Sequence, residues 1–344
     1  MKNKKKDMVR LNANENFYGC SPDVLKAIKK NIKNVHLYPG IPFRLEEKLA
    51  GKFGVKQKNI VVGAGSVRLI DGIIQTFVEP DEEIIIFERS FVAYEQLAVA
   101  HRRKYIVAKQ TNFICDVENI FPLITQKTKA IFIANPNNPT GTIITHSQLE
   151  NLLKNISEKI IVVMDEAYCE YVTDTSFPDS FSLQRKYSNL VILRTFSKIY
   201  GLAGLRIGYG IADEKFSNSF KKSRIPFFFN SLSEEAALAA LADEKYVKKC
   251  LEKNSEQRDY LYQNLKTIGL NTVPSQGNFM YVVFNNDTEK ESAYKKLSDA
   301  GIMICNLKVF GQDKSLRIGI GNKSTNKKIV RCFFNKYYSH ILNR

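Results

Sequence analysis

The sequence of 344 residues lacks several features that would exclude or assign whole classes of protein. Its six cysteines are scattered, with no CxxC pair and no cluster with histidine, which argues against a disulfide framework and a zinc site. No apolar run approaches the roughly 18 residues of a membrane-spanning helix. The charged first residues lead into no apolar segment of the kind found in secretory signals. We therefore expect a protein of the reducing cytoplasm.

Charge and composition leave room for a large globular protein. The apolar fraction of 44% and the charged fraction of 25% are ordinary, and the length suffices for two domains. A net charge of +16 would suit nucleic-acid binding, but the lysines are spread along the chain among acidic residues and accompany no recognition motif. We interpret the charge as a solvated surface, which also gives a positive field around a pocket for small anions.

Short apolar runs alternate with helical stretches over the first two thirds of the chain. Five such runs are expected strands: 60–62, 84–87, 131–134, 160–164 and 190–193. The alternation predicts an α/β fold whose mainly parallel sheet is covered by helices on both faces. A helix is expected to start at Ser21, where Pro22 and Asp23 follow a capping hydroxyl.

The pattern changes near residue 231, which predicts a second, smaller α+β domain. Ser231 and Glu234 suggest a capping box at the start of a long helical stretch that runs to about residue 269. Two further strands are expected at 279–284 and 316–320. The predicted division is an arm that joins the small domain, a large domain, a linking helical stretch and a small domain, at 1–35, 36–235, 236–269 and 270–344.

Two glycine- or proline-rich turns follow predicted strands. Residues 63–66 (GAGS) open a helical stretch, so their backbone N–H groups could hold a phosphate, although most such turns only reverse the chain. Residues 135–141 (NPNNPTG) would by themselves indicate a rigid proline turn.

Two further motifs place ionisable side chains at strand ends. Asp165, in the segment DEAY, follows five apolar residues, and a carboxylate at the mouth of a buried strand needs a cation nearby. Metal binding by Asp165 and Glu166 is the alternative, but no histidine is near in sequence. The segment TFSK ends at Lys198, with Arg206 eight residues later. Hydroxyls, an amine and a guanidinium at a strand's carboxyl end suit a phosphorylated cofactor attached through an imine, whereas a lone lysine is usually a surface charge.

As an ordered set, these motifs resemble the fold-type-I pyridoxal-phosphate aminotransferases, and within them the histidinol-phosphate aminotransferase group. The resemblance runs from residues 11–16 (LNANEN) to 317–319 (RIG) and so covers nearly the whole chain. It implies a transaminase with pyridoxal 5'-phosphate as cofactor. The amino group would move from a donor, with glutamate as first candidate, to a small phosphorylated ketone or aldehyde. It also implies a homodimer with shared active sites.

The resemblance assigns the catalytic roles residue by residue. Lys198 would form the Schiff base with the cofactor aldehyde and then move the proton from the substrate α-carbon. Asp165 would pair with the ring nitrogen and keep it protonated. Asn138 and Tyr168 would hydrogen-bond the ring oxygen, and Phe91 would stack on the ring face.

The remaining contacts divide between the cofactor phosphate and the substrate. The residues implied for the phosphate are Gly65, Ser66, Val67, Thr195, Ser197, Arg206 and, from the neighbouring subunit, Tyr38. Arg317 would bind the donor carboxylate, while Tyr18 and Asn14 would lie near the substrate.

Two positions depart from the group's pattern. Val67 and Arg68 replace an acidic pair after the glycine turn, which backbone phosphate binding should tolerate. Cys305 stands where the group has an arginine that binds the substrate phosphate. Losing one such contact would weaken binding by about 1.5–3 kcal/mol unless Lys308 or another cation compensates. A smaller phosphorylated ketone is therefore as plausible an acceptor as the keto partner of histidinol phosphate.

Other functions remain as alternatives. A decarboxylase of a phosphorylated amino acid would resemble the same group. A transcriptional regulator built on this fold would carry a helix-turn-helix segment, and only about ten residues precede Leu11. A dinucleotide-dependent dehydrogenase is disfavoured because no GxGxxG follows the first strand.

Overall fold

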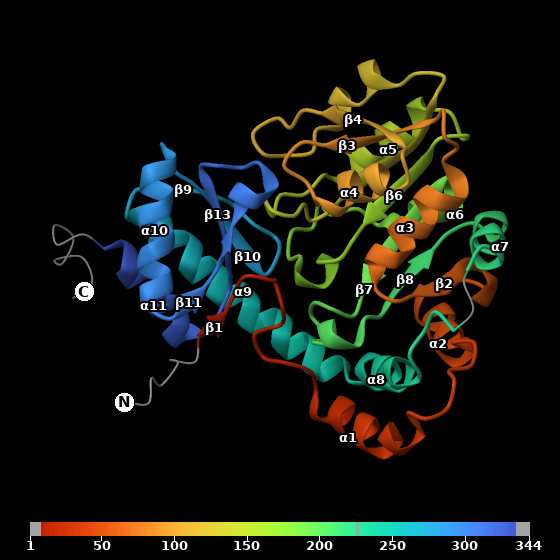
Figure 1. Cartoon of the computed structure of the whole chain (residues 1–344), viewed down its shortest axis with the longest axis horizontal. Coiled ribbons are helices and arrows are strands. Elements are labelled where there is room, and N and C mark those ends of the chain that lie inside the picture. Colours follow the sequence, from red (N-terminus) through yellow and green to blue (C-terminus); the bar gives the residue numbers. More distant parts are fainter. Residues whose placement is uncertain (1–7, 225–226, 335–344) are drawn as a thin grey trace.

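The computed structural model describes residues 8–224 and 227–334, which form two larger sheets beside each other and one two-stranded sheet (Figure 1). The larger sheet has seven strands in the order β2-β8-β7-β6-β5-β3-β4. Their bounds are β2 Ile60–Gly63, β3 Glu83–Phe87, β4 Lys104–Ala108, β5 Thr128–Ala134, β6 Ile161–Asp165, β7 Leu190–Thr195 and β8 Gly208–Ile211. The five strands from β7 to β4 are parallel, and β8 is antiparallel to both of its neighbours.

Continuous apolar runs explain why the central strands are buried on both faces. In β5, Ile131 and Ile133 join one core cluster, whereas Ala130 and Phe132 join the cluster on the opposite face. This alternation is the two-residue period of a strand, and a parallel sheet needs apolar side chains on both sides. The α/β fold with a mainly parallel, helix-covered sheet is therefore confirmed.

Helices with one apolar face cover each side of this sheet. The first core cluster contains side chains of α1 Pro22–Asn31, α2 Phe43–Phe53, α5 His146–Asn155, α6 Ser180–Lys186 and α8 Ser231–Ala242. The second contains side chains of α3 Ser66–Phe77, α4 Ala93–Ala100 and α7 Glu214–Lys222. Ser21 caps α1 as predicted, because its hydroxyl accepts a hydrogen bond from the backbone N–H of Val24.

The smaller sheet is antiparallel and has four strands in the order β12-β13-β10-β9. Its bounds are β12 Cys305–Asn306, β13 Ser315–Gly319, β10 Phe279–Val283 and β9 Asn271–Val273. It packs with α9 Glu244–Thr267, α10 Asp287–Asp299 and α11 Lys323–Phe333. The arm strand β1 Val9–Arg10 pairs in parallel with β11 Ile302–Met303, which attaches the arm to the part of the chain that carries the smaller sheet (Figure 1).

Three sequence expectations need correction or completion. Asn230, not Ser231, caps α8, and the side chain of Glu234 instead accepts a hydrogen bond from the backbone N–H of Leu45. The long helical stretch is two helices, because α8 ends at Ala242 and α9 begins at Glu244. Strands β4 and β8 were not expected from the sequence.

The domain boundaries stay a prediction, and their ends at 1–7 and 335–344 lie outside the described residues. Within the described ranges, no helix has both the length and the apolar character to cross a membrane. The cytoplasmic location stays a prediction from the sequence.

Candidate active site

A cavity of about 300 Å³ lies where β5, β6 and β7 end and where the loop after β12 approaches them. Most of the predicted site residues line it: Asn14, Ser66, Val67, Phe91, Asn138, Asp165, Tyr168, Thr195, Ser197, Lys198, Arg206 and Arg317. They come from the arm, from both sheets and from the start of α3. Parallel strands present their carboxyl ends at one edge of a sheet, which explains why residues so distant in sequence converge here.

Lys198 follows β7 and points its amine toward the arm. Its Nζ donates to the backbone carbonyl of Ala13 over 3.2 Å and lies 5.2 Å from the centre of the Tyr168 ring. Tyr168 is itself held in place, because Asn14 Nδ2 donates to its hydroxyl over 3.0 Å and its ring packs edge-on against Phe279. A primary amine next to a buried phenol is thus available at the wall of the cavity.

Asp165 ends β6 and is only 3% exposed. Its Oδ2 accepts a hydrogen bond from the Tyr94 hydroxyl at 2.9 Å, whereas Oδ1 has no hydrogen-bond partner within the described part of the chain. Burial raises the pKa of this carboxyl to about 6, against the opposing effects of the Tyr94 hydrogen bond and the Lys198 charge. A buried acid with one free oxygen suits a ligand that presents an N–H group.

Glu166 is held by Arg194, so the acidic pair does not present both carboxylates to one cation. Both Nε and Nη2 of Arg194 donate to Glu166 Oε2, at 2.9 and 2.7 Å. Successive residues of an extended chain point to opposite faces, which separates this ion pair from Asp165. No group of three metal-ligating side chains occurs in the ranges that the structure describes.

The first turn of α3 and Arg206 together form a cradle for an anion. Ser66 begins the helix, and the N–H groups of a helix's first turn have no partners within the helix. Gly65 precedes it with a φ of 85°, and a Cβ at this position would collide with the guanidinium of Arg206. Arg206 Nη1 donates to Ser197 Oγ at 3.1 Å. The backbone conformation therefore favours glycine, and the missing side chain leaves room for the Arg206 guanidinium.

Arg317 is the third cation of the cavity and comes from β13. It is 8% exposed, and its Nη1 and Nη2 donate to Asn138 Oδ1 at 2.5 Å and to the Asn12 carbonyl at 2.7 Å. Its Nε has no hydrogen-bond partner among the described residues. A buried, rigidly held guanidinium of this kind suits a carboxylate or phosphate.

Among the described residues, β12 and the turn after it contribute no charged side chain to the cavity lining. Cys305 lies opposite Arg317 in the sheet, and burial raises the pKa of its thiol, so the thiol is neutral. The amine of Lys308 lies 3.3 Å from Asp287 Oδ2, and Lys308 does not line the cavity. Leu307 and Phe310 line the end of the cavity near β12 instead.

Three predicted residues do not line the cavity. Gly65 lies behind Ser66 and acts through the backbone. Tyr18 does not line the cavity, and its ring centre lies 4.9 Å from the amine of Lys253. Tyr38 is 80% exposed and its ring packs against Phe227, with ring centres 4.4 Å apart.

Sequence reasoning missed several residues that shape the cavity. Tyr94 lies one helical turn after Phe91, a spacing that could have suggested a shared face. Ala13 could have been suspected from its place beside Asn14. No sequence signal pointed to Leu307, Phe310 or Gln312, which reach the cavity through the pairing of β12 with β13.

Comparison with known proteins finds relatives in sequence and in structure over nearly the whole chain. Residues 6–333 match the family model described as aminotransferase class I and II. The histidinol-phosphate aminotransferase of Moorella thermoacetica is 39% identical over 328 residues, covering 95% of this chain and 84% of that protein. The crystal structure of the histidinol-phosphate aminotransferase from Sinorhizobium meliloti in complex with pyridoxal-5'-phosphate has a TM-score of 0.88 at 27% identity, covering 95% of this chain and 90% of the other. The corresponding enzyme of Clostridium acetobutylicum has a TM-score of 0.86 at 27% identity, covering 95% and 98%.

Proposed function

The chain belongs to the aminotransferase class I and II family, and from this premise we propose that it moves an amino group from glutamate to a small phosphorylated ketone or aldehyde. It is a pyridoxal-phosphate-dependent transaminase of fold type I. The keto partner of histidinol phosphate is the first candidate for the acceptor, because relatives with that name match nearly the whole chain. The decarboxylase alternative gains no support from these relatives and is not retained.

The residues of the cavity fit the cofactor. The unpartnered Oδ1 of Asp165 suits a protonated ring nitrogen, and the glycine turn beside Arg206 suits a phosphate. Bound pyridoxal phosphate supplies an aldehyde that accepts the amino group and a ring that withdraws electrons from the reacting carbon. Phe91 would pack on the ring face, and Asn138 with Tyr168 would bind the ring oxygen.

The chain's own groups divide the remaining work. Lys198 would hold the cofactor covalently through its Nζ, and the same amine would serve as the base that takes the proton from the donor's α-carbon. The Ala13 carbonyl holds that amine when it is free. Arg317 binds the donor carboxylate through the N–H groups that face the cavity, which orients the α-carbon toward Lys198.

The observation that carries this proposal is the placement of an amine, a buried carboxyl and two guanidiniums around one cavity. Arg206 serves the cofactor phosphate and Arg317 the donor carboxylate. Cys305 is neutral and Lys308 is paired with Asp287, so neither provides a free positive charge for a second substrate anion near β12. A smaller phosphorylated ketone therefore stays a second candidate, because its phosphate could reach the cations deeper in the cavity.

The site is completed by a second copy of the chain. Exposed apolar side chains gather on the segment between α1 and α2: Ile32, Val35, Leu37, Tyr38, Ile41 and Phe43. Such a concentration is typical of a protein interface. In a homodimer this segment would carry Tyr38 to the partner's cofactor phosphate, which explains why Tyr38 lies outside the cavity of its own chain.

A half-reaction screen tests the proposal. Glutamate should convert the bound cofactor to its amino form, seen as a change in the visible absorbance. Candidate carbonyl compounds, phosphorylated and unphosphorylated, are then added and the return of the original spectrum is recorded. We expect phosphorylated acceptors to restore it fastest. If only unphosphorylated acids do so, the phosphorylated acceptor is wrong, and if glutamate causes no change, the donor is wrong.

A further inference from the structure

Asn137 is buried between two segments that line the cavity, although it does not line the cavity itself. Its Nδ2 donates to the backbone carbonyl of Arg89 at 2.9 Å and to Thr140 Oγ1 at 2.8 Å. Its Oδ1 accepts a hydrogen bond from the Ser90 hydroxyl at 2.8 Å. Both N–H groups and the oxygen of this amide are therefore used, which no other side chain of similar size could do.

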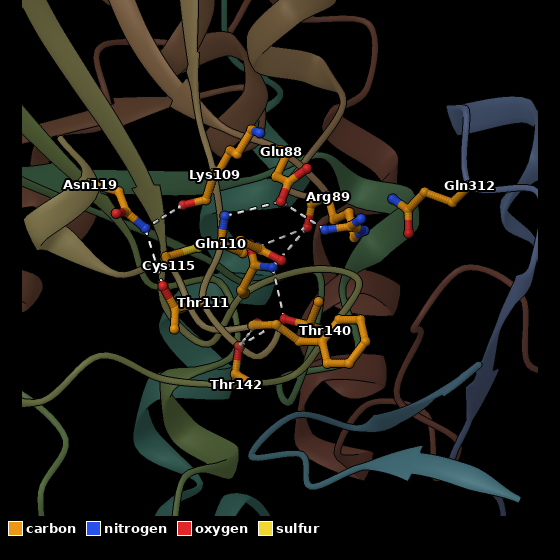
Figure 2. Close-up of polar contacts among 12 residues, drawn as sticks. Glu88, Arg89, Lys109, Gln110, Thr111, Cys115, Asn119, Thr140, Thr142 and Gln312 are labelled. Atoms are coloured by element: carbon orange, nitrogen blue, oxygen red, sulfur yellow. Dashed lines mark hydrogen bonds and ion pairs between the residues drawn. The ribbon is translucent and has the colours of Figure 1, made fainter. Parts of the chain in front are cut away.

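The hydrogen bonds run in one direction away from Asn137. The Thr142 hydroxyl donates to the carbonyl of Phe113 at 2.7 Å, so in its 2.8 Å contact with Thr140 it must accept. Thr140 in turn accepts from Asn137. Figure 2 shows Arg89 near Thr140 and Thr142, which belong to a different segment of the chain. A chain of donors that ends on a backbone carbonyl leaves the amide of Asn137 only one orientation.

On one side, this network holds an unusual piece of backbone. Arg89 has a φ of 46°, a left-handed conformation that residues other than glycine rarely adopt. Its carbonyl is bound by Asn137 and, at 3.3 Å, by Gln110 Nε2, both from outside its own segment. Phe91 follows two residues later and lines the cavity. The direction of the Phe91 ring therefore depends on how firmly the Arg89 carbonyl is held.

On the other side, Asn137 is followed directly by Asn138, which lines the cavity and accepts a hydrogen bond from Arg317. The backbone of Asn137 is also fixed, because its N–H donates to the Thr142 carbonyl at 2.8 Å and its own carbonyl accepts from Gly141 at 2.7 Å. One buried amide thus joins the segment that carries Phe91 to the loop that carries Asn138.

We propose that Asn137 is a positioning residue that sets the spacing between Phe91 and Asn138, and thereby the fit of the cofactor ring between them. The inference rests on the proposed stacking role of Phe91. Alanine at position 137 would leave the Ser90 hydroxyl and one acceptor site of the Arg89 carbonyl unsatisfied. The left-handed turn would then relax and the Phe91 ring would lose its fixed place, while the covalent attachment at Lys198 would remain.

The test is a double-mutant cycle in which the measured quantity is the dissociation constant of the cofactor. Asn137→Ala, Phe91→Ala and the double variant are prepared without cofactor and titrated with pyridoxal phosphate, following the absorbance and induced circular dichroism of the bound cofactor. We expect each single change to raise the dissociation constant about tenfold. If Asn137 acts through Phe91, the double variant should lie within about threefold of Phe91→Ala alone.

A matched control comes from the same loop. Asn135 is also a buried amide, but among the described residues its side chain bonds only the backbone of Ile144, at 3.0 and 3.5 Å. Asn135→Ala should lower the thermal stability of the cofactor-free protein while leaving the dissociation constant within about threefold. Ser90→Ala, which removes one hydroxyl from the network, should raise the dissociation constant about threefold and provides the test if Asn137→Ala does not fold.

The outcomes separate this inference from its premise. Independent, multiplicative effects of the two single changes, or an equal loss of affinity in Asn135→Ala, would overturn the positioning role while leaving the stacking role of Phe91 intact. Unchanged affinity in Phe91→Ala would overturn both. None of these results depends on which acceptor the enzyme uses, because only cofactor binding is measured.

Discussion

The two ends of the cavity are built in different ways. The cofactor end stands on the ends of long central strands, where Asp165 and Thr195 are each 3% exposed. The end near β12, where we propose that the acceptor binds (the acceptor end), is formed by the arm, the two-residue strand β12 and the short turn after it, where Phe310 is 39% exposed. Buried strands with paired neighbours tolerate little change, whereas short exposed elements can vary without loss of the fold. The comparison suggests that reaction chemistry and acceptor choice are carried by separable parts of the molecule.

Replacing Lys198, at the cofactor end, should have the largest effect on activity. Lys198→Ala removes both the covalent attachment and the base, so turnover should fall by at least about 10⁴-fold. The cofactor should still bind, because the cradle at α3 and Arg206 is unchanged. Turnover with glutamate and retention of cofactor after dialysis are the measurements. Lys308→Ala removes a lysine outside the cavity and serves as control; substantial turnover in Lys198→Ala would contradict the assignment.

Asp165 tests whether the buried carboxylate at the cofactor end lowers the folding stability of the cofactor-free protein. The folded-state pKa of about 6 lies above the ordinary 3.8, so the folded protein holds this proton more tightly than the unfolded chain. Stability therefore falls as pH rises from about 4 to 6 and stays lower above that. Asp165→Asn removes this cost and keeps an acceptor for Tyr94.

The cofactor-free Asp165→Asn variant should thus be more stable than the parent at pH 7.5, by up to about 3 kcal/mol, with the difference shrinking toward pH 4. Urea unfolding at both pH values measures it. With cofactor present, the same variant should lose most of its turnover. A variant that is less stable than the parent at pH 7.5 would show that the ionised Asp165 carboxylate does not destabilise the folded protein.

The smallest effect is expected from a substitution at the acceptor end. Cys305→Arg would place a cation at the neutral end of the cavity and should lower the KM for a phosphorylated acceptor about tenfold, because one charge-assisted hydrogen bond contributes about 1.5–3 kcal/mol and Arg317 nearby opposes part of it. The glutamate half-reaction should not change. Cys305→Met, which adds volume without charge, is the control. An effect of equal size on both half-reactions would deny that the two ends are separable.

The sequence predicts the cofactor end better than the acceptor end, for a physical reason. Continuous apolar runs mark buried strands, and the polar residues that follow them had to meet at one edge of the sheet. The edge strand β4 was missed because several of its side chains are exposed, and β8 because Gly208 and Gly210 are typical of turns. The acceptor end depends on contacts between distant short elements, which no local pattern encodes.

The amide network shows the same limit within a single motif. The string NPNNPTG predicted a rigid turn and drew attention to Asn138, but nothing in it indicated that Asn137 would reach the carbonyl of Arg89, 48 positions earlier. Tyr94 likewise reaches Asp165 across 71 positions. Side-chain partners of this kind follow from how the strands are ordered in the sheet.

The pairing of β1 with β11 has a consequence for the way the protein is made. Val9 and Arg10 are synthesised well before their partners Ile302 and Met303, because nearly 300 positions separate the two strands. At about 5–20 residues per second, the arm waits roughly 15–60 seconds for the strand it joins. Until residues 302–303 have been made, β1 has no partner strand to hold the arm that carries Ala13 and Asn14, so a nascent chain whose large sheet has already formed still presents an open, unfinished site.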